Sequence, residues 1–152
     1  MKTYQLPSVL TIDYSKWRCG FNGKNQVGKG DTKLHNDEGY ECCLGQWANQ
    51  AGVQTGDLDL HYPSALPHHG ICVLGLTNNK TQTALAKRCA DINDNRVITT
   101  AKRVKRLKAV LGKSHYKLKL KNFPPSVISQ LKKLGVKCDI QQADEEDIQD
   151  MR

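Results

Sequence analysis

Residues 39–46 read Gly-Tyr-Glu-Cys-Cys-Leu-Gly-Gln and lie at the centre of the stretch that decides the fold, residues 17–53. This stretch contains half of the six cysteines, both tryptophans and the densest group of glycines. From Tyr40 to Ala51 the apolar residues recur at steps of three and one, which predicts a helix with one buried face. Gly52 follows directly and indicates where this helix ends.

Outward from this stretch, the chain shows further helix and strand patterns. Residues 8–14 mix β-branched and apolar side chains, which predicts a strand. Three more helical patterns follow, at residues 79–91, 99–111 and 124–135. Strict alternation of apolar and polar residues predicts two strands on either side of the last helix, at residues 116–121 and 136–140. Strand, helix and strand in this order predict a βαβ or split βαβ unit.

The length of 152 residues is typical of one domain. We therefore predict a single α+β domain over residues 1–142, with a small mixed sheet packed by about four short helices. Residues 143–152 are predicted to be an acidic C-terminal tail. No apolar run approaches the ~18 residues of a membrane span, and no signal-peptide pattern is present. We expect a cytoplasmic protein with no membrane partner.

The charge is distributed unevenly along the chain. The formal net charge is +8, yet residues 95–138 contain thirteen Lys or Arg and no Asp or Glu. The sign then reverses in a short acidic segment that contains Asp139, Asp144, Glu145, Glu146, Asp147 and Asp150. A basic body followed by an acidic segment indicates an anionic partner. The alternative is a solvated basic surface that only aids solubility.

Two groups of basic residues are the candidates for binding an anion. The first lies on the predicted helix 99–111 and the strand after it, and comprises Lys102, Arg103, Lys105, Arg106 and Lys117. The second lies in and before a glycine-rich segment, and comprises Arg18, Lys24 and Lys29.

The glycine-rich segment, residues 23–30, nearly matches the phosphate-binding loop G-x-x-x-x-G-K-[ST]. It ends in Gly30, however, where that loop has a hydroxyl for magnesium, and no clear buried strand precedes it. Two interpretations stay open at this point. The backbone N–H groups of the segment bind an anion, or the segment is a surface hairpin.

Cys42 and Cys43 are the candidates for a catalytic nucleophile. They lie where the predicted helix begins, and the helix dipole at that end lowers the pKa of a thiol. Cysteine catalysis also needs a base, which one of the five histidines would have to supply. Because Cys43 falls on the predicted apolar face, packing is the alternative explanation. In a cytosolic protein we expect all six thiols to be reduced.

A structural zinc site is a further hypothesis, because cysteines and histidines are the usual zinc ligands. The candidate ligands are Cys19, Cys42, His68, His69 and Cys72. Strong zinc signals come as two short-spaced pairs of ligands, and only one such pair is present here. Apart from zinc, the sequence predicts no cofactor.

Four segments together carry a resemblance to a known family. They read Trp-Arg-Cys-Gly at 17–20, Gly-Asp-Thr-Lys-Leu at 30–34, Gly-Tyr-Glu-Cys-Cys-Leu-Gly-Gln at 39–46 and Ile-Asn-Asp at 92–94. Over roughly residues 12–110 this pattern resembles a family of small tailed-bacteriophage proteins. No activity or catalytic residue is established for that family, so none is carried over. The resemblance implies a phage-encoded protein that acts in the bacterial cytoplasm.

The leading hypothesis combines this setting with the charge pattern. We expect a non-enzymatic binding protein that counters a host function, such as defence. Its partner would be anionic: a nucleotide signal, nucleic acid or an acidic host protein surface. A cysteine-dependent enzyme and a small zinc-stapled interaction module are the alternatives.

Overall fold

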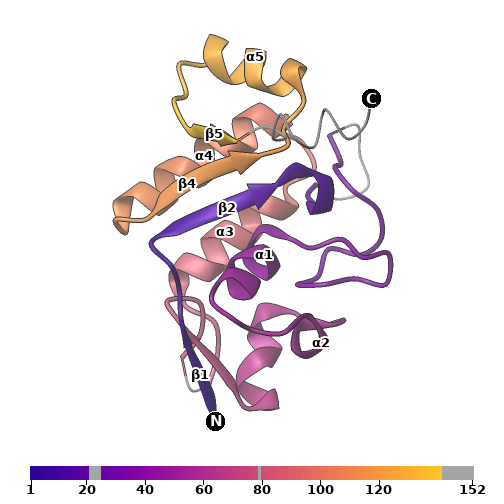
Figure 1. Ribbon diagram of the computed structural model, residues 1–152, viewed down its shortest axis with the longest axis vertical. Coiled ribbons are helices and arrows are strands. Elements are labelled where there is room, and N and C mark those ends of the chain that lie inside the picture. Colours follow the sequence, from indigo (N-terminus) through magenta and orange to yellow (C-terminus); the bar gives the residue numbers. More distant parts are fainter. Residues whose placement is uncertain (21–24, 79, 142–152) are drawn as a thin grey trace, which may run out of the picture.

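The computed structural model of the protein describes residues 1–20, 25–78 and 80–141. The predicted acidic tail lies outside these residues. Along the chain the elements are β1 (Lys2–Gln5), β2 (Val9–Asp13), the 3-10 turn η1 (Tyr14–Lys16), α1 (Cys43–Gln50), α2 (Thr55–Leu58), the 3-10 segment η2 (Pro63–His69), β3 (Ile71–Leu74), α3 (Ala84–Asp94), α4 (Thr100–Lys113), β4 (Lys117–Lys121), α5 (Pro125–Lys133) and β5 (Asp139–Gln141). They form a single α+β domain, which confirms the predicted fold class (Figure 1).

The strands form two small parallel sheets, where the sequence predicted one mixed sheet. One sheet has the order β2-β4-β5, and the other pairs β1 with β3. Pro7 lies between β1 and β2 and explains the change of partner, because a proline has no N–H to donate to a continuing ladder. The β4–α5–β5 segment is a βαβ unit with parallel strands, as predicted.

The three-stranded sheet has one buried face and one polar face. Its buried face carries Leu10, Ile12, Leu118 and Leu120, which pair in register as Leu10 with Leu118 and Ile12 with Leu120. Helix α4 packs against β4 on this side and contacts α3 and α5 at its flanks (Figure 1). Because side chains alternate along a strand, the polar face carries Thr11, Asp13, Lys117, Lys119 and Lys121.

Helices α4 and α5 begin and end within two residues of their predicted bounds, whereas α3 begins later than predicted, at Ala84, and extends to Asp94, and α1 begins at Cys43 where Tyr40 was predicted. Thr99 caps α4 by accepting a hydrogen bond from the N–H of Lys102 at 3.2 Å. Thr83 caps α3 in the same way through Ala86 N–H. No helix in the described part of the chain is both long and apolar enough to span a membrane.

Asn93, at the end of α3, joins three segments that are distant in sequence. Its side chain is fully buried, and its Oδ1 accepts hydrogen bonds from Trp17 Nε1 at 2.8 Å and from Cys43 N at 3.1 Å. Its Nδ2 donates to the carbonyl of Arg18 at 3.1 Å, and its own carbonyl accepts from Gly20 N at 2.7 Å. One asparagine therefore fixes α3, the start of α1 and residues 17–20 relative to one another.

The first turn of α1 depends on this asparagine and on a glycine. The residue before the helix, Cys42, makes no side-chain capping bond, so Asn93 supplies the acceptor that a helix N-terminus requires. A Cβ at Gly45 would lie 1.8 Å from the carbonyl oxygen of Leu34. Only glycine lets α1 approach the neighbouring chain this closely.

Two glutamines of α1 cover the free edge of β2. Gln50 accepts from Thr11 N at 3.0 Å and donates to Thr11 O at 2.6 Å. Gln46 makes the same pair of bonds with Asp13, at 2.7 and 3.1 Å. The distance between the two glutamines along the helix matches the distance between Thr11 and Asp13 along the strand, because four helical residues rise about 6 Å and two strand residues about 6.6 Å. The two amides thus replace the strand that an exposed edge would otherwise attract.

Asn93→Ala should lower the free energy of unfolding by about 3 kcal/mol, because it leaves the buried Trp17 and Cys43 N–H groups without an acceptor. Urea unfolding followed by tryptophan fluorescence measures this loss. Asp91→Ala, on the exposed side of the same helix, is the control, with an expected change within about 0.5 kcal/mol. Equal stabilities of the two variants would contradict the role given to Asn93.

Candidate functional site

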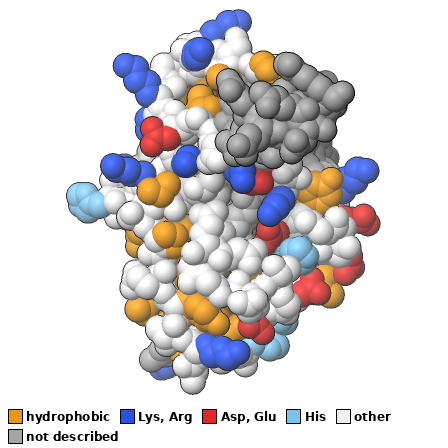
Figure 2. Space-filling model, in the orientation of Figure 1, with side chains coloured by type: hydrophobic (Ala, Val, Ile, Leu, Met, Phe, Trp, Pro, Cys, Tyr) orange, Lys and Arg blue, Asp and Glu red, His pale blue; other side chains and the backbone are white. Residues whose placement is uncertain are grey.

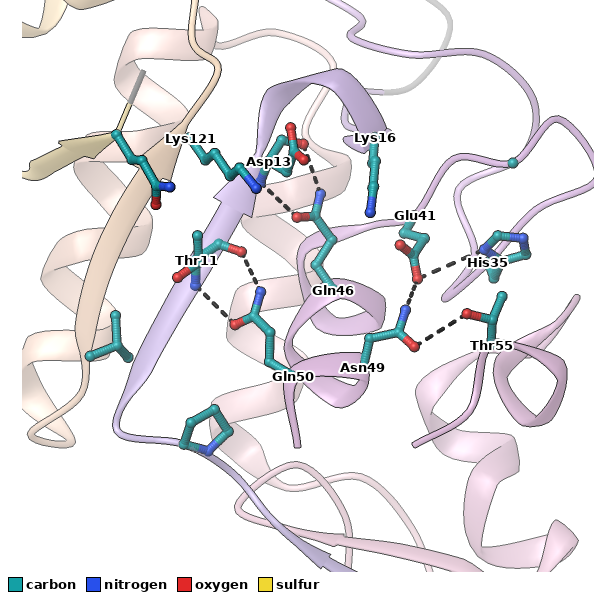
Figure 3. Close-up of a pocket in the computed structure, with 14 residues that line it drawn as sticks. Thr11, Asp13, Lys16, His35, Glu41, Gln46, Asn49, Gln50, Thr55 and Lys121 are labelled. Atoms are coloured by element: carbon teal, nitrogen blue, oxygen red, sulfur yellow. Dashed lines mark hydrogen bonds and ion pairs between the residues drawn. The ribbon is translucent and has the colours of Figure 1, made fainter. Parts of the chain in front are cut away.

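A cleft of about 730 Å³ lies between α1 and the polar face of the three-stranded sheet (Figure 3). The last residues of all three parallel strands line it: Asp13 of β2, Lys121 of β4 and Gln141 of β5. Ligands of open α/β sheets bind outside the carboxyl ends of the strands, which makes this cleft a candidate site. Its opposite wall comes from α1 and from residues 35–41.

Asp13 is held as a carboxylate at one end of the cleft. Its Oδ1 accepts hydrogen bonds from Ser15 N at 3.0 Å, Ser15 Oγ at 2.6 Å and Asn122 Nδ2 at 3.1 Å. Partial burial opposes ionisation, but these bonds and the nearby Lys121 outweigh it and lower the pKa of Asp13 below its ordinary value.

Glu41 lies on the other side of the cleft in a more buried network. Only 6% of its surface is exposed, and its Oε2 accepts a hydrogen bond from Asn49 Nδ2. His35 Nδ1 is 3.8 Å from the same oxygen, and Thr55 Oγ1 donates to Asn49 Oδ1 at 3.4 Å. Burial raises the pKa of Glu41, and the neighbouring His35 and Lys16 oppose that shift.

The predicted basic residues of α4 and β4 lie on opposite sides of the molecule. Lys102, Lys105 and Arg106 are exposed on α4, which packs against the buried face of the sheet. Lys117 is exposed on the polar face. Figure 2 shows this second side, where most Lys and Arg side chains lie in the upper half of the view. The structure thus divides the first predicted group into two surfaces.

Arg103 does not belong to either surface, and the prediction that it contacts an external anion is corrected here. Its side chain is fully buried, and its Nη2 donates to the carbonyls of Asn95 at 2.7 Å and Ile98 at 3.3 Å. Its Nη1 donates to Asn25 O at 3.4 Å and to Cys19 Sγ at 3.3 Å. The guanidinium satisfies carbonyls of two loops and is not accessible to a ligand.

Arg18 is likewise buried, with 2% of its surface exposed, so its assignment to the second anion-binding group is also wrong. Its Nε donates to Gly30 O at 2.7 Å, and its Nη1 donates to the carbonyls of Cys19 and Gly20. Burial lowers the pKa of its guanidinium, although nearby acidic groups oppose the shift. Its guanidinium ties residues 19 and 20 to residue 30.

The glycine-rich segment is organised by its carbonyl groups. Asn36 Nδ2 donates to Lys29 O at 2.6 Å and to Asp31 O at 2.8 Å, and Arg18 bonds to the carbonyl between them. An anion-binding loop needs converging N–H groups instead. This geometry favours the hairpin interpretation. Lys29 is exposed, and Lys24 lies outside the described residues.

Cys42 and Cys43 have the environment of packing residues. Cys42 is 7% exposed and Cys43 fully buried. Burial raises the pKa of Cys42 to about 12 and that of Cys43 well above its ordinary value. Cys43 Sγ contacts the carbonyl of Cys89 at 3.9 Å. Because a thiolate is the nucleophile in cysteine catalysis, this environment argues against a catalytic role.

The five candidate zinc ligands do not converge. Among the described residues, no group of three or more His, Cys, Asp and Glu side chains is arranged to hold a metal ion. Cys19 contacts Arg103, and Cys72 Sγ contacts the carbonyl of Thr77 at 3.7 Å. His69 stacks on His61 with ring centroids 4.1 Å apart, and His68 is exposed.

The cleft was not predicted from the sequence, although two sequence patterns indicate it. Gln46, Asn49 and Gln50 recur at steps of three and one, so they form a polar stripe beside the predicted apolar face of α1. Asp13 and Lys121 each lie at the carboxyl end of a predicted strand, where ligands of parallel sheets bind. No family model, curated protein or solved structure was found that matches this chain.

Alkylation of the native protein with a maleimide should modify Cys138 first, because Cys138 is partly exposed and the other five cysteines are buried. Cys42 and Cys43 should react only at the rate of unfolding, since their thiols are buried and protonated. Mass spectrometry of proteolytic peptides identifies the order of modification, and Cys138→Ser is the control. Rapid alkylation of Cys42 or Cys43 would instead support the cysteine-enzyme alternative.

Proposed function

We propose that the protein is a non-enzymatic binding protein whose partner is anionic. The observation that carries this proposal is an exposed cationic surface whose side chains form no ion pair with any described residue. Except for Arg103, every Lys and Arg in residues 95–138 reaches solvent at least partly. Within the described residues, the ion pairs are Lys33 with Asp31 and His35 with Glu41, and neither lies in this stretch.

A cationic surface of this kind attracts polyanions over long distances. Lys102, Lys105 and Arg106 project from one exposed side of α4, where they can contact successive phosphates or carboxylates. No carboxylate occurs between residues 95 and 138 to weaken the positive potential. The attraction is therefore expected to depend strongly on salt concentration.

The same region offers few groups for reading a nucleic-acid sequence. Phe123 is buried, and Tyr116 packs edge-on against Trp47 with centroids 4.8 Å apart. His115 is the one exposed ring of this region, so binding would rely mainly on the charge of the nucleic-acid backbone. Nucleic acid, a nucleotide signal and an acidic protein surface share the anionic chemistry that this surface suits.

The biological setting of the proposal comes from the phage resemblance. In that setting the protein would act in the bacterial cytoplasm and counter a host function such as defence. The buried and protonated state of Cys42 and Cys43 supports binding over thiol catalysis. The lack of convergence among the candidate zinc ligands gives the zinc-stapled module no support in the described part of the chain.

Fluorescence anisotropy with a labelled DNA duplex tests the proposal. The triple variant Lys102→Gln, Lys105→Gln, Arg106→Gln should weaken binding at least ~10-fold at low salt, and should reduce the slope of log K against log salt by about 2 to 3. The control Lys2→Gln, Lys80→Gln, Lys87→Gln removes the same charge from exposed positions elsewhere. Binding to duplex DNA, single strands and heparin that is absent or insensitive to salt would refute the proposal.

A further inference from the structure

We infer that the cleft at the carboxyl ends of β2, β4 and β5 binds a compact small molecule with at least two negative charges, between Lys16 and Lys121. The inference rests on the proposed anion-binding function and assigns it a defined site and a ligand class. Its basis is a count of which polar groups around the cleft already have partners and which do not (Figure 3).

One oxygen of each carboxylate in the cleft is engaged by neighbouring groups. Asp13 Oδ1 takes three hydrogen bonds, from Ser15 and Asn122. Glu41 Oε2 is bonded to Asn49 and lies beside His35. Both carboxylates are thus used to build the walls of the cleft.

The amide groups are engaged as well. Gln46 and Gln50 each make two bonds with the backbone of β2. The Asn49 amide donates to Glu41 through Nδ2 and accepts from Thr55 through Oδ1. Each amide makes one donor and one acceptor contact, and these contacts hold the shape of the cleft.

Two lysines supply the positive charge of the cleft. Neither Lys16 nor Lys121 forms an ion pair with a described residue, and both line the cleft. Lys16 extends from η1 toward the Glu41 side, while Lys121 comes from the end of β4 (Figure 3). His35 also lines the cleft, but its Nδ1 lies 3.8 Å from Glu41 Oε2, so the two ammonium groups are the cations without an ion-pair partner in the described part of the chain. Unused donors of this kind suit a ligand that brings acceptors and negative charge.

The size and lining of the cleft define the ligand further. A volume of about 730 Å³ is in the range of small-molecule sites. Among the described residues, no tryptophan, tyrosine or phenylalanine lines it, so His35 offers the one ring on which an aromatic base could stack. Asp13 and Glu41 weaken the long-range positive potential, which favours an anion that contacts both ammonium groups directly. A diphosphate group has this chemistry.

Isothermal titration calorimetry with pyrophosphate, and separately with ATP, tests the inference. The wild type should bind one equivalent of pyrophosphate, and Lys16→Gln, Lys121→Gln should weaken binding at least ~10-fold, since even one lost charged contact is worth about that factor. Lys16→Arg, Lys121→Arg should retain most of the affinity, because the charges remain. The control Lys102→Gln, Lys105→Gln removes the same charge from α4 and should change the affinity less than ~2-fold.

The outcomes separate the two proposals. If heparin or duplex DNA binds but pyrophosphate does not, or binds the glutamine variant equally well, the cleft assignment is wrong and the anion-binding function stands. If no anion of any kind binds, the proposed function itself fails. Because Lys16 is exposed, the single variant Lys16→Gln provides the same test should the double variant not fold.

Discussion

The carboxamide of Asn93 is the interaction on which the rest of the structure depends. The Asn93 side chain is fully buried. It connects the end of α3 to the indole of Trp17 and to the first N–H of α1. A buried amide is costly unless its donors and acceptors are paired, and here both sides are used. The segments 17–20, 39–46 and 92–94, which look unrelated in the sequence, meet at this residue.

The position of α1 links this junction to the candidate site. One side of α1 carries Cys43, Leu44 and Trp47 into the core. The adjacent stripe presents Gln46, Asn49 and Gln50, which fasten β2 and hold Glu41. A single short helix is therefore both the centre of the core and one wall of the cleft. A change at Asn93 would move the cleft because it would move this helix.

Periodicity in the sequence predicted the helices and the βαβ unit, because their patterns depend only on local spacing. The same spacing also indicates that Arg103 is buried, although its charge suggested an exposed position. Arg103 lies four and eight residues before Leu107 and Leu111, which places it on the buried stripe of α4. Charge alone cannot distinguish an arginine that faces solvent from one that satisfies loop carbonyls. Arg18 was misassigned for the same reason.

The cleft could not be assembled from the sequence, since its walls come from segments whose pairing is non-local. The parallel register of β2 and β4 places Asp13 opposite Lys121, and Lys16, three residues after Asp13, lines the same cleft. No local pattern reports that register. The two sheets likewise separate at Pro7. The separation is evident only from the pairing of β1 with β3 and of β2 with β4, which the local sequence around Pro7 does not report.

The central claim is that unpaired cations in a preformed cleft recognise a compact anion. Amide chemical-shift mapping of the ¹⁵N-labelled protein during a pyrophosphate titration tests it most directly. The account predicts saturable shifts at residues 13–16, 46–50 and 121–122, with residues 102–106 of α4 unchanged. Shifts concentrated on α4, or no saturable shift at any amide, would contradict it.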